Sequence, residues 1–193
     1  MIEHWEREEG VKFLRKIGMR PGQKVLDFGA RVGNYTIPAA IVVGERGLVY
    51  AVDKERSVLD ELKRKAAFLG LENVRVIYNS GGVKIDLENE SLDFVLLYDV
   101  LHYLKTRERK ILYSEIYRVL EPDGLLSVYP KHVIEDFPLD EFRTLHLEDV
   151  KQEIMDSSFA FQKRYCGMIS HDGYLNEGCV LNFWPCCKEV HLS

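Results

Sequence analysis

Residues 25–36, VLDFGARVGNYT, join a short apolar run to an aspartate and to a turn that contains two glycines. The run predicts a buried strand over KVLDF, and YTIPAAIVV after the turn predicts a helix. Glycines at such a turn allow positive φ angles and bring the backbone close to a ligand. Ligands of open parallel sheets bind beyond the carboxyl ends of the strands, so we expect the loop from Phe28 to Gly33 to bind a cofactor.

Strands and helices alternate in the prediction from residue 24 to about residue 130. This β-α-β pattern indicates right-handed crossovers on a parallel sheet. The further strands are expected in LVYAVD, NVRVIY, SLDFVLLY and LLSVYP, and the helices in KERSVLDELKRKAAFLG and TRERKILYSEIYRVL, with EPDG as a turn before the last strand.

Both ends of the chain depart from this alternation. Residues 2–17 predict an amphipathic helix, which Gly10 weakens. The tail predicts a helix over LHLEDVKQEIMDSS and then two strands joined through SHDGYLNEG, a hairpin on the sheet edge. The sequence thus predicts one domain over residues 1–193, with a capping helix at 1–18, a cofactor-binding core at 20–130, and a C-terminal helix and hairpin at 131–193.

The composition is that of a globular protein with a net charge of −5. No apolar run reaches the ~18 residues that span a bilayer, and the charged start MIEHWEREEG does not resemble a signal peptide. We therefore expect a cytoplasmic protein without a membrane partner. The acidic balance argues against a nucleic-acid partner, and the basic runs LKRKAAF and LKTRERK are interpreted as solvated helix faces.

The four cysteines lie in the last part of the chain, at Cys166, Cys179, Cys186 and Cys187. We expect them to be reduced, as is usual in the cytoplasm. No C-x-x-C pair is present, so the sequence predicts no metal site. If the hairpin forms, Cys166 and Cys179 lie on neighbouring strands, where a thiol or metalloid site is the alternative to simple apolar packing.

A dinucleotide is one cofactor class that uses a glycine loop. It needs the pattern G-x-G-x-x-G, so that a helix N-terminus can receive the pyrophosphate. Counting from Gly29, the next two glycine positions hold Arg31 and Asn34. The spacing therefore disfavours a dinucleotide oxidoreductase.

S-adenosylmethionine is the other class, and its methionine end carries an ammonium group. Asp27 can attract this group directly or through water. Asp53 ends the next predicted strand, 20 positions after Gly33, where a carboxylate can accept hydrogen bonds from both ribose hydroxyls. The alternative is that both aspartates only cap strands or helices.

The sequence resembles the class I methyltransferases that use S-adenosylmethionine. The likeness is carried by PGQKVLDFGARVGNYTIPAA and VVGERGLVYAVDKE, and continues through LGLENVRVI, SLDFVLLYDVLHYL and RVLEPDGLLSV, with a weaker likeness at LHLEDVKQEI. It covers about residues 20–130. The first motif is similar to V-L-D-x-G-A-G-x-G-x-x-T, from which Arg31 is the main departure. The fold implied is a Rossmann-like, doubly wound α/β fold of three layers, α/β/α, whose seven-stranded, mostly parallel sheet has a C-terminal antiparallel hairpin.

The resemblance also implies a set of site residues. S-adenosylmethionine, and its product S-adenosylhomocysteine, would be contacted by Asp27, Gly29, Ala30, Arg31, Gly33, Asp53, Lys54, Asn79, Ser80 and Tyr98. Asp53 would bind the ribose, Lys54 would lie beside the adenine, and Tyr98 near the transferring methyl. Asn79 or Ser80 would approach the adenine edge, although the family often has an acidic residue there. The Arg31 guanidinium would point either to the cofactor's carboxylate or out over the pocket mouth.

Methyl transfer from a sulfonium is an in-line displacement in which the protein mainly supplies alignment. A general base is needed only where the acceptor must lose a proton. The acceptor-side candidates follow the fourth and fifth predicted strands: Tyr98, Asp99, His102, Tyr103, Lys131 and His132. His102 and Tyr98 are the catalytic candidates, and His102 either acts as a base or shapes the pocket.

The predicted function is methyl transfer from S-adenosylmethionine to an acceptor that the sequence does not identify. A small molecule fits the size and acidity of the chain, with a protein side chain as the alternative. The competing function is an S-adenosylmethionine-binding protein without transfer activity, acting as a regulatory or partner subunit. By resemblance, the N-terminal helix would lie over the cofactor, with Trp5 or His4 closing the pocket. The sequence does not indicate the oligomeric state.

Overall fold

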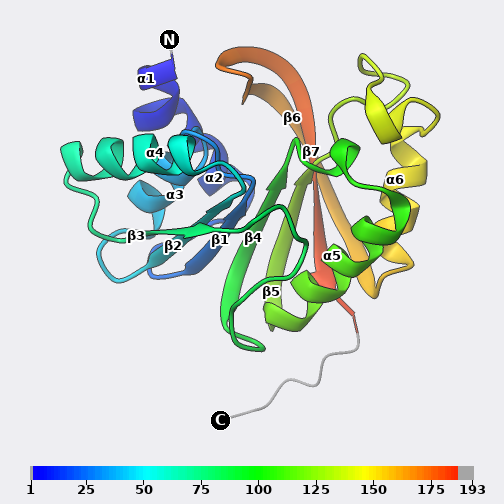
Figure 1. The fold of residues 1–193 in the computed structure, drawn as a ribbon, viewed down its shortest axis with the longest axis horizontal. Helices are drawn as coiled ribbons and strands as arrows, with labels where there is room; N and C mark the ends of the chain where they lie inside the picture. The colour runs from blue at the N-terminus through cyan, green and yellow to red at the C-terminus, as the bar shows by residue number, and fades with distance from the viewer. Residues whose placement is uncertain (1, 187–193) are drawn as a thin grey trace. The chain divides into compact units, whose positions relative to one another are not determined.

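The computed structural model describes residues 2–186 and contains a seven-stranded sheet with the strand order β3-β2-β1-β4-β5-β7-β6 (Figure 1). Among the pairings, β1–β2, β2–β3 and β4–β5 are parallel and β5–β7 is antiparallel. The predicted Rossmann-like α/β fold is therefore confirmed. The chain divides into two compact units: the first runs to Gly82 and includes Cys166–Gly178, and the second spans Val83–Tyr165 and resumes at Cys179.

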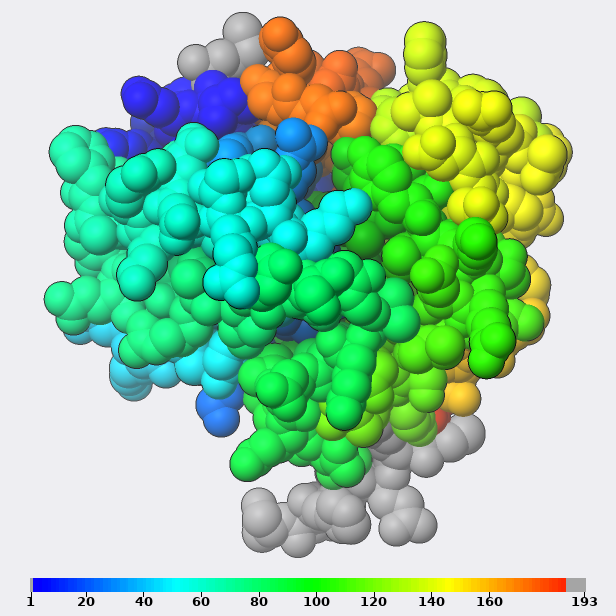
Figure 2. Space-filling model, viewed as in Figure 1, coloured from blue at the N-terminus to red at the C-terminus, as the bar shows by residue number. Residues whose placement is uncertain are grey.

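The first unit is built on three parallel strands, in which Asp27 pairs with Ala51 and Val52 with Ile77. Its elements are α1 (Ile2–His4), η1 (Trp5–Glu9), α2 (Gly10–Lys16), β1 (Lys24–Phe28), α3 (Thr36–Val43), β2 (Leu48–Asp53), α4 (Arg56–Phe68) and β3 (Val74–Tyr78). These bounds agree with the predicted strands and helices within a few residues. Figure 2 shows the surface of α4 in cyan. The basic run of this helix is partly a solvated face, since Lys63 and Arg64 are exposed, whereas Lys65 Nζ donates to buried Glu6 at 2.7 Å.

The N-terminal helical segment is interrupted, because η1 is a π-helical turn between α1 and α2. Gly10 follows this turn, and a Cβ there would lie 2.8 Å from the Trp5 carbonyl oxygen and 3.2 Å from Pro38 Cβ. The glycine is thus needed for close packing and does not merely weaken the helix. Trp5 is 1% exposed, and its Nε1 donates a hydrogen bond to the Asn34 carbonyl at 2.8 Å.

The second unit pairs two parallel strands with part of the C-terminal hairpin. Its elements are β4 (Leu92–Tyr98), η2 (Leu101–Tyr103), α5 (Thr106–Val119), β5 (Leu120–Tyr129), η3 (Asp140–Phe142) and α6 (Leu147–Met155). The basic run at the start of α5 is only partly a solvated face. Arg109 is 2% exposed and donates to both carboxylate oxygens of Glu153 at 2.7 and 2.8 Å, which joins α5 to α6.

The prediction of a turn at EPDG is wrong, because β5 already begins at Leu120 and runs through these residues. Leu92 pairs with Leu120, but Phe94 pairs with Leu125, so the extra residues form an irregularity in the ladder. A bulge of this kind keeps a strand continuous while locally breaking its pairing. Proline and glycine in the sequence therefore marked an interruption within the strand and not its start.

The predicted hairpin consists of β6 (Phe159–His171) and β7 (Tyr174–Pro185), and its connection is shorter than expected. Asp172 and Gly173 form the turn with φ angles of 49° and 80°. Two successive positive φ angles are typical of a type I′ turn, for which Asp-Gly is a favoured pair. The remaining residues of SHDGYLNEG belong to the strands.

The expectation of reduced cysteines is wrong for Cys166 and Cys179, which are both disulfide-bonded. Cys186 is free, and Cys187 lies outside the described residues. Across residues 2–186 no helix has the length and apolar character that crossing a bilayer requires.

Candidate functional site

The glycine loop of the first unit begins where β1 ends and is tied to the neighbouring strand. The amides of Gly29 and Ala30 both donate to the Val52 carbonyl, at 2.8 and 2.9 Å. Gly29 has a φ of 87° and Gly33 a φ of 95°, in the region that glycine adopts without strain. The loop is therefore held in one conformation by backbone hydrogen bonds.

Gly33 also lies against the core of the first unit. A Cβ at this position would be 2.4 Å from Leu62 Cδ1 and 3.3 Å from Ile37 Cγ1. Ile37 and Leu62 belong to the same buried cluster as Ala30. Close helix–strand packing at the loop thus requires glycine at 33, independently of any ligand.

Asp27 is buried under the loop, with 3% of its surface exposed. Its Oδ2 accepts a hydrogen bond from Thr36 Oγ1 at 2.6 Å. Burial raises the pKa of Asp27 to about 7, and the charge of Asp53 adds to this rise, while the Thr36 hydrogen bonds oppose it. A cation placed beside this carboxyl group would favour its ionised form.

Asp53 ends β2 and is fixed by two backbone amides. Its Oδ2 accepts from the Arg31 amide at 2.8 Å, and its Oδ1 from the Glu55 amide at 2.9 Å. A carboxylate has about four lone-pair sites. One site on each oxygen thus stays available after these two bonds, which is the arrangement that a vicinal diol requires.

Arg31 has an unusual backbone conformation and an ion-pair partner in the hairpin turn. Its φ is 48°, in the left-handed region that glycine favours. Its guanidinium donates to Asp172 Oδ1 at 2.5 Å, in an ion pair whose side chains are 65% and 56% exposed. The arginine therefore reaches the turn of the β6–β7 hairpin, while its amide orients Asp53.

Two more contacts join the hairpin tip to the loop within the first unit. Asn34 Nδ2 donates to Ser170 Oγ at 3.1 Å, and the Tyr35 hydroxyl donates to the Ser170 carbonyl at 2.7 Å. These partners lie more than a hundred positions apart, and no local motif in the sequence marks them.

The remaining predicted residues of the first unit lie at its strand ends. The Asn79 amide donates to the Asp53 carbonyl at 2.9 Å, and Asn79 Oδ1 accepts from the Gly82 amide at 2.8 Å. Lys54 and Ser80 are exposed. Asp27, the loop and Asp53 are thus brought together, with Asn79 next to Asp53.

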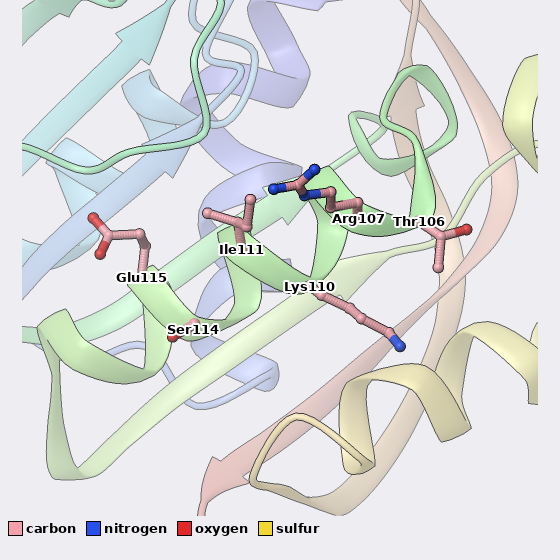
Figure 3. A pocket seen from close by; sticks show the side chains of 6 residues that line it. All are labelled: Thr106, Arg107, Lys110, Ile111, Ser114 and Glu115. Atoms are coloured by element: carbon pink, nitrogen blue, oxygen red, sulfur yellow. The ribbon is translucent and has the colours of Figure 1, made fainter.

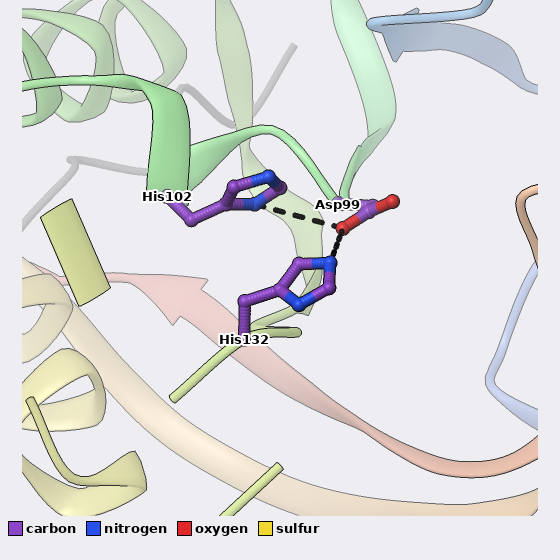
Figure 4. Close-up of side chains that lie close together, drawn as sticks. All are labelled: Asp99, His102 and His132. Carbon is purple, nitrogen blue, oxygen red and sulfur yellow. Dashed lines mark ion pairs between the residues drawn. The ribbon is translucent and has the colours of Figure 1, made fainter. Parts of the chain in front are cut away.

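The second unit holds the predicted acceptor-side residues. The Tyr98 hydroxyl is within 2.8 Å of Ser127 Oγ, and Tyr98 is 5% exposed. His102 is 1% exposed. Figure 4 shows the rings of His102 and His132 directed at the Asp99 carboxylate, with nitrogen–oxygen distances of 3.6 and 3.5 Å.

Lys131 and Tyr103 lie next to this group with different partners. Lys131 Nζ donates to both oxygens of Asp136, at 2.6 and 2.7 Å, which neutralises its charge locally. Tyr103 is 60% exposed and its ring centroid is 3.9 Å from that of His102.

A shallow groove lies elsewhere in the second unit, along α5. Its lining side chains are Thr106, Arg107, Lys110, Ile111, Ser114 and Glu115 (Figure 3). None of these is a predicted site residue. The groove is therefore not the candidate site.

The first unit thus combines an α/β fold with a glycine loop after the first strand and an acidic residue that ends the second, as in proteins that bind an adenosyl cofactor. Comparison with known proteins identifies the family. The family model described as a methyltransferase domain matches residues 25–124. The chain therefore belongs to the class I S-adenosylmethionine-dependent methyltransferase family.

Curated relatives match part of the chain. A probable cobalt-precorrin-6B C(15)-methyltransferase (decarboxylating) of Saccharolobus solfataricus is 33% identical over 85 residues, or 44% of this chain and 43% of the relative. A demethylmenaquinone methyltransferase of Staphylococcus aureus is 29% identical over 119 residues, or 60% of this chain and 46% of the relative. The chain thus spans less than half the length of these relatives.

A solved structure supports the fold over nearly the whole chain. A SAM-dependent methyltransferase from Aquifex aeolicus superposes with a TM-score of 0.75, covering 93% of this chain and 91% of that chain at 24% identity. At this level of identity the similarity supports the fold, and residue roles rest on the geometry described above.

Proposed function

We propose that this protein transfers a methyl group from S-adenosylmethionine to a small-molecule acceptor. The observation that carries the proposal is the Asp53 carboxylate, which two backbone amides hold at 2.8 and 2.9 Å. It keeps one lone-pair site on each oxygen for the two ribose hydroxyls. The pairing of this carboxylate with a glycine loop fits an adenosyl cofactor.

Asp27 supports a cationic cofactor over an anionic one. A carboxyl group with a pKa of about 7 becomes ionised when an ammonium or sulfonium group binds nearby, which adds a favourable charge interaction. A pyrophosphate at the same place would force the carboxyl group to stay protonated. We therefore propose that Asp27 attracts the methionine end, with Gly29, Ala30 and Gly33 offering close backbone approach.

The acceptor class is proposed from the relatives. The two curated relatives described above are named for a cobalt-precorrin and for demethylmenaquinone, both small molecules. Tyr98 and His102 stay predictions as catalytic residues, as do the cofactor contacts of Arg31, Lys54, Asn79 and Ser80. The single-domain division and the cytoplasmic location also stay predictions.

Calorimetry with S-adenosylmethionine, S-adenosylhomocysteine and NAD tests the cofactor. We expect binding of the two adenosyl compounds and none of NAD. Asp53→Asn and Asp53→Ala should weaken adenosyl binding by at least about 100-fold, because two hydrogen bonds to a charged group are lost. Asp60→Asn, at an exposed aspartate of α4, is the matched control and should bind as the unmodified protein does.

Binding of NAD alone would overturn the proposal, and so would an unchanged adenosyl affinity in both Asp53 variants. Transfer is measured as S-adenosylhomocysteine formed with a panel of phenols, thiols, amines and tetrapyrroles. Adenosyl binding without product across the panel would favour the competing function, a binding subunit without transfer activity.

A further inference from the structure

Three side chains of the second unit direct potential metal ligands at one point. Asp99 follows β4, His102 lies in η2, and His132 follows β5. Their ligand atoms all lie within 4.8 Å of one another. Asp99 Oδ1 is the shared partner, at 3.6 Å from His102 Nδ1 and 3.5 Å from His132 Nε2 (Figure 4).

One nitrogen of His132 is held by the backbone, which orients the other toward Asp99. Nδ1 lies 3.0 Å from the Phe137 carbonyl oxygen. A carbonyl can only accept, so Nδ1 carries the hydrogen, and in a neutral imidazole Nε2 then presents a lone pair. Nε2 and the Asp99 carboxylate oxygen then face each other as two ligand atoms around a cation would.

The distances favour a metal ion over a proton as this cation. A charge-assisted N–H···O bond is about 2.7–2.9 Å long, and both separations here are well above that. Bond lengths of about 2.0–2.1 Å and tetrahedral angles place neighbouring ligands of Zn²⁺ about 3.4 Å apart. The observed separations of 3.5 and 3.6 Å match that value.

The backbone around the group is specifically shaped. Asp99 and His132 have φ angles of 56° and 69°, a region that costs a non-glycine residue about 1 kcal/mol or more. The Asp99 amide donates to Tyr129, and the Leu139 amide donates to the His132 carbonyl, both at 3.2 Å. Residues kept in strained conformations by their surroundings are often functional.

Burial completes the requirements for a metal site. His102 and His132 are 1% and 7% exposed, which protects their nitrogens from water. The Asp99 side chain is 20% exposed and leaves an approach to the group. The hydrogen bond from His132 to a backbone carbonyl is the outer contact that usually fixes a ligating imidazole.

We propose that Asp99 Oδ1, His102 Nδ1 and His132 Nε2 bind a divalent transition-metal ion of the Zn²⁺ type. Two imidazoles and one carboxylate are an established ligand set for Zn²⁺ and Fe²⁺. Three protein ligands leave a further position for water or for an oxygen, nitrogen or sulfur atom of a small ligand. The sequence predicted no metal site because it contains no C-x-x-C pair, whereas these ligands are an aspartate and two histidines that come from separate segments of the chain. The proposal does not depend on methyl transfer.

Metal titration of the full chain tests the site without cofactor. Protein treated with a chelator is titrated with Zn²⁺ by calorimetry and with Co²⁺ by visible absorption. We expect one ion per chain and the intense Co²⁺ bands of a four-coordinate ion, which shift when azide is added to the open position. Asp99→Asn and His132→Gln should each lower the Zn²⁺ affinity by more than about 100-fold, since even outer contacts are worth about 10- to 100-fold.

Two designs keep the result interpretable. Asparagine is nearly the same size as aspartate and tolerates a positive φ, so Asp99→Asn should fold, which circular dichroism checks. His146→Gln is the matched control, because His146 is an exposed histidine of the same unit and should leave the affinity unchanged. Absence of Zn²⁺ and Co²⁺ binding in the unmodified protein would overturn the proposal. Equal affinity in Asp99→Asn and the control would also overturn it.

Discussion

The glycine loop of the first unit and the Asp99 group of the second unit both follow buried parallel strands, but they hold polar atoms differently. In the loop, backbone amides make the hydrogen bonds: those of Gly29, Ala30 and Arg31 all donate to acceptors on β2. In the Asp99 group, side chains from three segments meet, and the distances from the histidine nitrogens to the Asp99 oxygen exceed those of charge-assisted hydrogen bonds. Hydrogen bonds within the protein fix the loop, whereas the ligand atoms of the Asp99 group have the spacing of a metal site.

The two regions gain different things from a bound ligand. A preformed loop with an oriented carboxylate binds a cofactor with little reorganisation, so its ligand mainly gains contacts. A group of facing lone pairs is stabilised when a cation enters, so its ligand contributes to folding stability as well. Mutations at the two regions should therefore differ in how their effects depend on pH, on packing and on metal.

The largest effect is expected for Asp27→Asn at high pH. The pKa of Asp27 rises from an ordinary 3.8 to about 7. The folded protein thus holds this proton more tightly than the unfolded chain, and stability falls as the pH rises from about 4 to about 7. Asparagine keeps an acceptor for Thr36 and has no proton to lose. At pH 8 the variant should be more stable by at most about 4 kcal/mol, at about 1.4 kcal/mol per pKa unit.

Urea unfolding at pH 5 and pH 8 measures this effect. The advantage of Asp27→Asn should grow between the two pH values, while Asp60→Asn stays constant. An advantage that does not change with pH would mean that Asp27 ionises as freely in the folded protein as in the unfolded chain.

Gly33→Ala should be the next largest change. The added Cβ would lie 2.4 Å from Leu62 Cδ1, and the φ of 95° strains any residue with a Cβ. Overpacking and positive φ together cost about 3 kcal/mol. Thermal unfolding measures the loss, and Gly81→Ala is the control, since its φ is also 95° but no atom lies within 4 Å of the added Cβ. Equal losses in both variants would remove packing as the reason.

Zinc should stabilise the protein through the second unit. At a free concentration of 100 times the dissociation constant, one bound ion adds about 2.7 kcal/mol. Asp99→Asn should abolish most of this gain, whereas Asp27→Asn should keep it. Unfolding followed with and without Zn²⁺ measures the gain, and an equal gain in both variants would place the ion outside the Asp99 group.

Local sequence was enough to predict the strands, most helices and the polar residues at the strand ends. The reason is that the spacing of apolar residues and the placement of glycines are local signals. The apolar run before Asp27 predicted a strand and the glycines after it predicted a loop, and both are present. Asp99, His102 and His132 were likewise expected after their strands, because parallel strands bring their carboxyl ends to one edge.

Contacts between distant segments were beyond this kind of prediction. Arg31 and Asp172 are 141 positions apart, and neither residue carries a signal for the other. The metal geometry of Asp99 and the two histidines depends on backbone angles that charge and hydrophobicity do not encode. The EPDG turn failed for a related reason, since the pairing partner of β5 decides whether the strand continues through a bulge.

Arg31→Gly should have the smallest effect on stability. Glycine relieves the positive φ of 48°, a gain of about 1 kcal/mol. The variant loses the ion pair to Asp172, but both side chains are more than half exposed, and such pairs contribute about 0–1 kcal/mol. The amide that orients Asp53 is kept in glycine. We therefore expect a change in unfolding free energy of less than about 1 kcal/mol.

Asp172→Asn separates the two contributions to this balance. It removes the charge of the ion pair while leaving Arg31 and the Asp-Gly turn in place, because asparagine also favours a type I′ turn. If relief of the positive φ at residue 31 outweighs the lost ion pair, Arg31→Gly is slightly stabilising and Asp172→Asn slightly destabilising. A large loss of unfolding free energy in both variants would instead mean that the hairpin tip orders the loop. A weaker adenosyl affinity in Arg31→Gly alone would mean that the guanidinium leaves Asp172 and contacts the cofactor's carboxylate.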